Sequence, residues 1–135
     1  MRRIRKQKKD NEAPITKPRK PMKVALSGVH FELDGEIKDY VANKIGKLNK
    51  FMPEKDSDSA YAEVKLKGSA GRGRQEYTCE AIIHLPYLVV VVHKSADSMK
   101  AAIDLVEDNL KIQLKRSRDR KLAKRRRLNR FFRRH

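Results

Sequence analysis

The longest amphipathic pattern in the chain runs from Ser95 to Arg118, where apolar residues recur at steps of three and four. This spacing places them on one stripe of a helix, which predicts that the helix covers an apolar surface. The stripe comprises Met99, Ala102, Ile103, Val106, Leu110, Gln113 and Leu114. Ser95 and Asp97 are both candidate N-caps, because either side chain can accept from the free amides of the first turn. Cations follow Leu114, so one helix is expected to join a packing face to a positively charged end.

A second helical pattern covers residues 34–52. Asp34 is the expected N-cap, and Pro53 is expected to end the helix because proline disrupts a continuing helix. The apolar positions that should face the core are Ile37, Tyr40, Val41, Ile45, Leu48 and Met52. The sequence therefore predicts two helices, one toward each end of a central domain.

Four segments show the alternating or valine-rich pattern that is typical of strands. They cover residues 23–29, 60–67, 74–85 and 88–93. The alternation in the second segment is typical of a half-buried antiparallel strand. Gly28 is expected at a bulge or bend, residues 68–73 should form a mobile hairpin loop, and Pro86 should end the third strand. The inward side chains are expected to be Val24, Leu26, Ala62, Val64, Leu66, Tyr77, Cys79, Ala81, Ile83 and Leu85.

The order of these elements is β-α-β-β-β-α, which predicts an α+β domain with two helices on one face of a four-stranded sheet. We expect a disordered basic arm over residues 1–21, a folded domain over residues 22–118 and a basic tail over residues 119–135. The prolines of the arm discourage a helix there. The tail has apolar residues at Leu122, Leu128, Phe131 and Phe132. Through them it either extends the last helix or meets a protein surface, and the alternative is disorder until RNA is bound.

Charge is distributed unevenly along the 135 residues, which include 34 Lys and Arg against 17 Asp and Glu. Residues 1–23 carry 10 basic and 2 acidic residues, and residues 115–135 carry 12 and 1. Residues 24–114 are nearly neutral, with 12 basic and 14 acidic residues. Two cationic ends around a neutral centre favour a polyanion such as nucleic acid over a small-molecule substrate.

The sequence offers little catalytic or metal-binding chemistry. The 4 histidines lack the spacing of metal ligands, and the glycine-rich segment resembles neither a Walker loop nor a dinucleotide fingerprint. Cys79 lies in an alternating strand, which favours a buried structural thiol and is compatible with a reducing cytosol. No apolar run is long enough to span a membrane and the start lacks a secretory signal, although an organelle presequence stays open. We therefore expect no enzyme, metal or cofactor, and a cytoplasmic location.

Cations recur beside the apolar stripes of both predicted helices. They are spaced by three or four residues, at Lys44, Lys47, Lys50, Lys111, Lys115 and Arg118. One such lysine is usually only solvated, but two rows and two arms of a single sign favour a broad RNA-binding surface. The chain has no Trp and its aromatic residues are expected to be mostly buried. Recognition through phosphate positions and shape is therefore predicted in place of base stacking.

Four segments carry a resemblance to a known family, namely Met22–Gly28, Phe31–Leu33, Ser98–Asp104 and Gln113–Arg116. They look like the ribosome hibernation-promoting factors, also called the ribosome-associated inhibitor A family, from Met22 to about Arg118. The resemblance implies a fold similar to the double-stranded RNA-binding domain. It also implies binding between the head and body of the small ribosomal subunit, where these factors cover the tRNA and mRNA sites. The family's basic helix positions would fall on Lys44, Lys47, Lys115, Arg116 and Arg118.

The chain departs from the family pattern at three helix positions. Lys100 stands where tyrosine is common, and Ile112 and Asn109 stand where arginine and lysine are common, a loss for which Lys111 would compensate. The acidic tail of the short inhibitors is replaced by a basic one, and the second, ribosome-pairing domain of the long members has no counterpart, so we expect the short form. The residues predicted to bind RNA are Lys44, Lys47, Lys50, Lys100, Lys111, Lys115, Arg116 and Arg118.

Two functions remain open, and a third class, an enzyme, finds no support. The first is a hibernation factor that regulates translation under stress by binding the small ribosomal subunit and its rRNA and occluding the tRNA and mRNA sites. The alternative is a general RNA-binding or ribosome-assembly protein of the same fold. In either case we expect RNA as the partner, no membrane, no DNA, and a monomer away from the ribosome.

Overall fold

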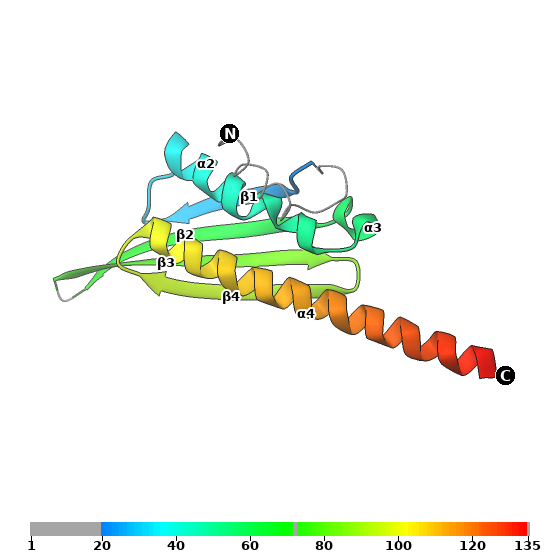
Figure 1. Ribbon diagram of the computed structural model, residues 1–135. Helices are drawn as coiled ribbons and strands as arrows, with labels where there is room; N and C mark the ends of the chain where they lie inside the picture. The colour runs from blue at the N-terminus through cyan, green and yellow to red at the C-terminus, as the bar shows by residue number, and fades with distance from the viewer. Residues whose placement is uncertain (1–19, 72, 135) are drawn as a thin grey trace, which may run out of the picture.

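The computed structural model describes residues 20–71 and 73–134, and its eight elements give the predicted α+β order with two additional short helical segments (Figure 1). The bulk of the predicted basic arm, residues 1–19, lies outside the described residues. The elements are β1 (Lys23–Val29), α2 (Gly35–Lys44), the 3₁₀ helix η1 (Gly46–Phe51), α3 (Glu54–Ser57), β2 (Tyr61–Gly71), β3 (Arg74–Leu85), β4 (Leu88–Ala96) and α4 (Met99–Arg134).

The four strands form one mixed sheet in the order β1-β2-β3-β4. β2 is antiparallel to β3, as its alternation predicts, but it runs parallel to β1. The parallel pair follows from the connection, because a helical crossover returns the chain to start β2 beside the start of β1. One inward row crosses the whole sheet in register, from Leu26 through Val64 and Ala81 to Val92.

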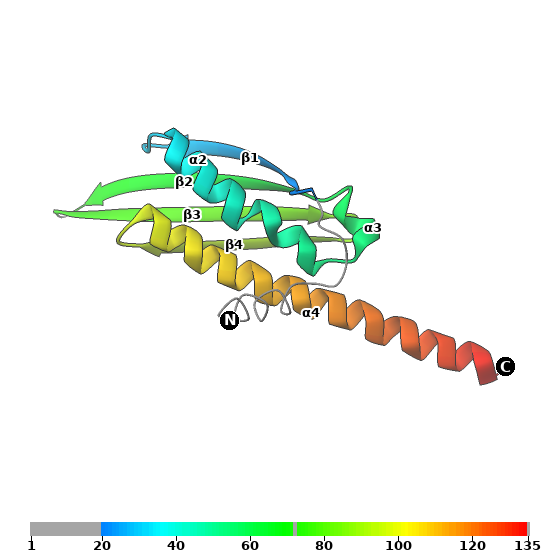
Figure 2. The ribbon, with the colours of Figure 1, turned by 45° about the horizontal axis from the view of Figure 1, so that its top comes forward.

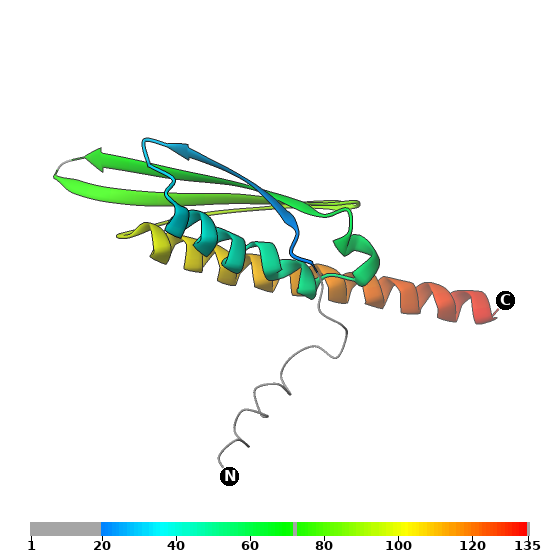
Figure 3. The same ribbon diagram turned by 90° about the horizontal axis from the view of Figure 1, so that it is seen from above.

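The helices α2, η1 and α4 lie on one face of the sheet and leave the opposite face open (Figures 2 and 3). The apolar stripe of α4 is buried as predicted, with Ile103, Val106 and Leu110 all 0% exposed. Ile45 of the first helical region is also 0% exposed. The core is therefore the layer between the sheet and these helices, built from the inward positions of every strand.

The last helix starts four residues later than predicted, at Met99. Its cap is Ser98, whose Oγ accepts from the amide of Ala101 at 3.2 Å, so the prediction of Ser95 or Asp97 was wrong. Ser95 belongs to β4, which continues to Ala96. There its hydroxyl lies 2.8 Å from that of Thr78 on β3. Pairing with the neighbouring strand thus keeps the chain extended past the polar residues that could have capped a helix.

The first helix begins as predicted but changes type halfway. Asp34 is confirmed as the N-cap, since its Oδ1 accepts from the amide of Ile37 at 2.9 Å. The α-helix ends at Lys44, and a 3₁₀ segment follows, so one helix over residues 34–52 was wrong. The amide of Met22 donates to the carbonyl of Gly46 at 2.9 Å. This bond from the start of the sheet engages a carbonyl that a longer α-helix would have used.

The glycine-rich segment is largely strand, because β2 and β3 stay paired until Gly71 meets Arg74. The predicted loop over residues 68–73 therefore shrinks to a tight turn, in which Gly73 has φ 75°. Gly28 lies in an unbroken register with β2 and is not at a bulge. A Cβ at Gly28 would sit 2.6 Å from the carbonyl oxygen of Phe31, so glycine is needed for a close backbone approach.

The buried stripe of α4 predicts that Val106→Asp prevents folding, because it places an unpaired carboxylate in a site that is 0% exposed. The cost is several kcal/mol, on the order of the whole stability of a small domain. Leu105→Asp is the matched control, since Leu105 neighbours Val106 but is 45% exposed. Thermal unfolding by circular dichroism should show a cooperative transition for the control only. Equal melting of the two variants would contradict this packing.

Candidate nucleic-acid interface

The eight cations predicted to bind RNA all lie on the helix side of the domain, and the structure divides them into different environments. Lys44 is in α2 and Lys47 and Lys50 are in η1. The other five are in α4 and are Lys100, Lys111, Lys115, Arg116 and Arg118. Because α2 and η1 both contact α4, cations from the two segments approach each other across the helix layer. Two aromatic rings, Tyr40 and Phe51, mark the two ends of this surface.

Around Tyr40 the cations are balanced by acids. The Lys44 ammonium lies 3.6 Å from the Asp104 carboxylate and 3.7 Å from that of Glu107. The Tyr40 hydroxyl donates to Asp104 at 2.6 Å, which ties α2 to α4. Lys100 donates to Glu36 at 2.6 Å. A phosphate at this end would compete with carboxylates already in place, so the charge available for RNA is reduced.

The acids around Tyr40 also shift the pKa values of the groups that they contact. The Glu107 carboxylate, followed by that of Asp104, raises the pKa of Lys44. The hydrogen bond to Glu36 raises the pKa of Lys100, and the hydrogen bond to Asp104 raises the pKa of Tyr40. Both lysines therefore stay charged at neutral pH, but much of their field is directed at the neighbouring acids.

Around Phe51 the cations are gathered without acids. The ammonium groups of Lys50, Lys111 and Lys115 lie 5.3, 5.7 and 5.1 Å from the ring centroid. Attraction to the ring face offsets part of the repulsion between them, since each such contact is worth roughly 0.5–1 kcal/mol at an exposed site. Within residues 20–71 and 73–134, none of the ion pairs involves these three lysines. We call these three residues the Phe51 lysine cluster, and its geometry suits a phosphate group.

The remaining predicted cations flank this cluster. Lys47 and Arg116 are exposed, and Arg118 is half-buried with its Nε 4.0 Å from the Asp119 carboxylate. The structure thus brings Lys50, Lys111 and Lys115 together, places Lys44 and Lys100 against acids, and leaves Lys47 and Arg116 on the surface. Sequence reasoning missed Phe51 as an organising residue. The signal was an aromatic side chain directly after Lys50, at the end of the lysine row.

The acid partners at Tyr40 predict that Glu107→Gln increases affinity for RNA. Removing this carboxylate takes away one of the two acids that compensate Lys44, while Asp104 stays in contact with Lys44 and Tyr40. The expected gain is severalfold at low ionic strength and smaller at high salt. Glu76→Gln, an equal charge change at an exposed position of β3, serves as the control and should have less effect. Filter binding of a structured RNA measures the difference, and equal gains would show that only net charge matters.

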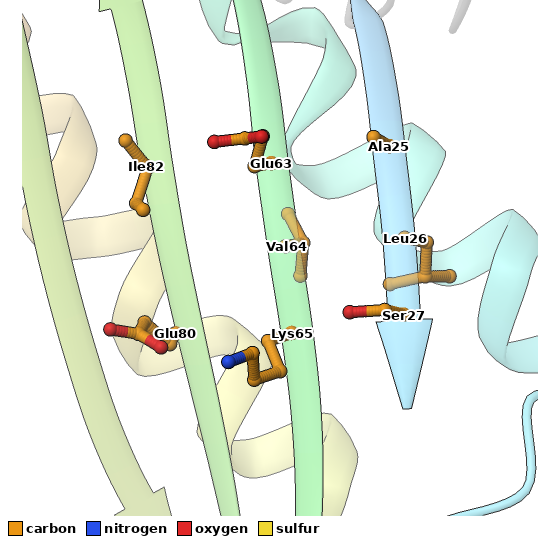
Figure 4. Close-up of a pocket in the computed structure, with 8 residues that line it drawn as sticks. All are labelled: Ala25, Leu26, Ser27, Glu63, Val64, Lys65, Glu80 and Ile82. Carbon is orange, nitrogen blue, oxygen red and sulfur yellow. The ribbon is translucent and has the colours of Figure 1, made fainter. Parts of the chain in front are cut away.

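The open face of the sheet has a different distribution of charge from the helix layer. Figure 4 shows a hollow over the sheet, where Ala25 and Ser27 leave space beside Glu63, Lys65 and Glu80. Acids and lysines alternate here, so the face has little net charge and a poor match to a polyanion. His84 is 2.9 Å from Glu63 and stacks on Tyr61, with ring centroids 4.4 Å apart.

Two exposed tyrosines correct one expectation about the aromatic residues. Tyr61 is 45% exposed and Tyr87 is 43% exposed, although the aromatic residues were expected to be mostly buried. Tyr61 has the outward parity of β2, opposite to Ala62 and Val64, and the alternation of the strand therefore contained this information. Tyr61 therefore lies on the open face, whereas Tyr87 is in the turn between β3 and β4.

No group of three or more His, Cys, Asp or Glu side chains that could hold a metal ion occurs in the described part of the chain. Cys79 is 0% exposed on the inward side of β3, as its alternation predicts. Burial, followed by the charge of Glu80, raises the pKa of its thiol to about 12. The thiolate needed for a nucleophile is therefore scarce near neutral pH. Among the described residues, no helix meets the length and apolarity needed to cross a membrane.

Burial predicts that Cys79 resists alkylation until the domain unfolds. The pKa of the thiol rises from 9.0 to about 12 on folding. The native state is therefore favoured below pH 9 by keeping the thiol protonated, and this contribution is lost as the pH rises toward 12. At pH 8.5, iodoacetamide should label the protein in urea and spare it without urea. Mass spectrometry measures the fraction labelled, and rapid labelling under native conditions would contradict the burial of this residue.

A mixed four-stranded sheet, one covered face and a helix layer with an unbalanced cationic end define a small basic α+β binding domain. The model of a family described as sigma 54 modulation protein / S30EA ribosomal protein matches residues 24–122. The chain belongs to this family, and its members of this type are not enzymes. The resemblance noted from the sequence is thereby confirmed.

Individual relatives agree with the family assignment. A protein named ribosome hibernation promoting factor from Azotobacter vinelandii is 29% identical over 104 residues, which are 76% of this chain and 89% of that protein. A protein of the same name from Pseudomonas putida is 26% identical over 98 residues, or 73% of this chain and 88% of that protein.

Solved structures share the fold. The N-terminal domain of Thermus thermophilus Protein Y has a TM-score of 0.58 at 28% identity, covering 73% of this chain and 100% of that domain. A ribosomal subunit interface protein from Coxiella burnetii has a TM-score of 0.57 at 16% identity, covering 71% of this chain and 97% of that protein, and shows likeness of fold. The α+β fold of the chain is therefore that of Protein Y.

Proposed function

We propose that this protein is a ribosome hibernation factor that binds rRNA of the small ribosomal subunit and inhibits translation by occluding the tRNA and mRNA sites. The Phe51 lysine cluster is the observation that carries the proposal, because it places three ammonium groups around one ring and none of them is in an ion pair among the described residues. The family and its relatives named ribosome hibernation promoting factor support the same partner.

In the proposed complex the helix layer faces the RNA. Lys47, Arg116 and Arg118 flank the cluster and extend the phosphate contacts along η1 and α4. Lys44 and Lys100 contribute less, since their charges are compensated by Asp104, Glu107 and Glu36. Recognition rests on phosphate positions and the shape of folded RNA, with the open sheet face turned away from the subunit.

The proposal also specifies which residues bind the ribosome and where in the cell they do so. Residues 22–118 form the ribosome-binding unit, and the basic segments on either side of it, residues 1–21 and 119–135, add affinity for RNA. In this proposal the protein acts in the cytoplasm during stress, as a monomer until it meets a subunit. Membrane and DNA have no part in this function.

The decisive variant is Lys50→Gln/Lys111→Gln/Lys115→Gln, which removes the Phe51 lysine cluster and leaves the core intact. Each well-formed contact to a charged group is worth roughly 1.5–3 kcal/mol. The loss of two or more such contacts should therefore weaken inhibition of cell-free translation more than a hundredfold. The inhibiting concentration is measured for each variant, together with competition by initiator tRNA for the small subunit.

The control is Lys23→Gln/Lys65→Gln/Lys67→Gln, which removes the same charge from exposed positions of the open sheet face. This variant should inhibit nearly as well as the parent. If the cluster variant inhibits as strongly as the control, or if initiator tRNA and the protein share one subunit without competition, occlusion is wrong. Sedimentation with precursor subunits in place of mature ones would then favour the assembly-factor alternative.

A further inference from the structure

The C-terminal part of α4 leaves the domain as a projecting helix. Among the side chains of α4 that the structure describes, the last buried ones are Leu114, 1% exposed, and Ser117, 6% exposed. Beyond Arg118 the described side chains are all exposed, and these are Asp119, Arg120, Lys124, Arg126, Arg127 and Leu128. Figures 1, 2 and 3 show this part of α4 continuing past the sheet, away from α2 and α3. From Ser117 to Arg134 it reaches about 26 Å at about 1.5 Å per residue.

This projecting helix is cationic, and none of its described side chains beyond Arg118 is buried. Residues 115–135 include 12 Lys and Arg against 1 Asp. Like charges at steps of three and four destabilise a helix, and a helix without tertiary contacts is marginal in water. Neutralisation by a polyanion would remove that repulsion, so the charge pattern itself selects an anionic partner.

The distribution of the cations argues for RNA over a protein surface. Arg120 and Arg127 fall near one side of the helix, while Arg126 falls on another, because successive residues turn by about 100°. Leu128 is the one large apolar side chain among the described residues beyond Arg118, and it is 47% exposed. The described side chains here are mainly cationic and lie on more than one side of the helix, which suits phosphates, since these can line a helix on more than one side.

We propose that residues 118–134 of α4 form an RNA-binding arm that contacts phosphates of a second RNA helix, apart from the RNA held by the Phe51 lysine cluster. The identity of that RNA as rRNA rests on the proposed function. Once bound RNA neutralises the arm, its continuity with the buried part of α4 sets the direction in which its cations lie from the cluster. Two linked contacts raise the overall affinity without any change in the cluster itself.

Directed cleavage tests where the arm lies. A single cysteine, Lys124→Cys in the arm, Lys47→Cys in the helix layer or Lys65→Cys on the open sheet face, is coupled to an iron chelate. Cys79 does not compete, because it is buried and its pKa is about 12. Hydroxyl radicals generated on the small subunit should cut rRNA from positions 124 and 47 at different segments, and only weakly from position 65. Identical cuts from positions 124 and 47, or none from 124, would overturn the second contact.

The salt dependence of RNA binding tests whether the cations of the arm contact phosphates. Lys124→Gln/Arg126→Gln/Arg127→Gln should flatten the dependence of log Kd on log salt by roughly 2–3 for an RNA duplex two turns long, at about 0.9 per phosphate contact. The open-face triple variant, with the same loss of charge, should leave the slope nearly unchanged. An unchanged slope for the arm variant rules out the arm, and so does cross-linking of a labelled Lys124→Cys to ribosomal proteins alone.

The two proposals fail in different ways. If the arm variant alone behaves like the parent on both the subunit and the duplex, the arm is wrong and occlusion by the cluster stands. If neither position 124 nor position 47 cuts rRNA while the arm variant still loses its salt slope on the duplex, the ribosomal partner is wrong and the arm stands as an RNA contact.

Discussion

The burial of the α4 stripe against β3 and β4 is the interaction on which the rest of the structure depends. Ile103, Val106 and Leu110 are fully buried, and they fix the rotation of α4 about its axis. Once that rotation is fixed, Lys111 and Lys115 must approach η1 and the Phe51 ring. The position of the Phe51 lysine cluster therefore follows from apolar packing, and its three lysines are not needed to stabilise the fold.

The helix layer separates charge along its length by the placement of acids. Asp104 and Glu107 lie in the first half of α4, where they bind Lys44 and Tyr40 across to α2. Between Asn109 and Arg118 the helix has no acidic residue at all. One half of the surface thus holds two helices together through ion pairs, and the other half keeps its cations for a partner. Lysine is present in both halves, but in the first half it forms ion pairs within the protein and in the second half it is available to a partner.

The sequence predicted the element order and nearly every inward side chain, because strand alternation and helix spacing report burial directly. It failed where tertiary contacts chose between local options. Ser95 was a plausible cap, yet pairing with Thr78 kept it in a strand, and the bond from Met22 helped turn the second half of the first helix into a 3₁₀ segment. These contacts join residues far apart in the chain, so no local pattern contains them.

The same limit applies to the site. The spacing of the lysine rows predicted that they lie beside the apolar stripes of the helices, but only the structure shows which lysines face acids and which lie around Phe51. Pairing of Lys44 with Asp104 and Glu107 depends on how α2 crosses α4, which spacing within either helix does not reveal. Sequence periodicity thus locates a charged face, while the distribution of free charge within that face is a property of packing.

The parallel pairing of β1 with β2, and the closing of the core by the last helix, have a consequence for synthesis. β1 cannot be paired until Tyr61–Gly71 has been made, and the sheet stays uncovered until residues up to Leu114 have left the exit tunnel. Contacts of this long range form late. The cationic surface between η1 and α4 is therefore among the last features of the domain to form, because it exists only once α4 has docked on the paired sheet.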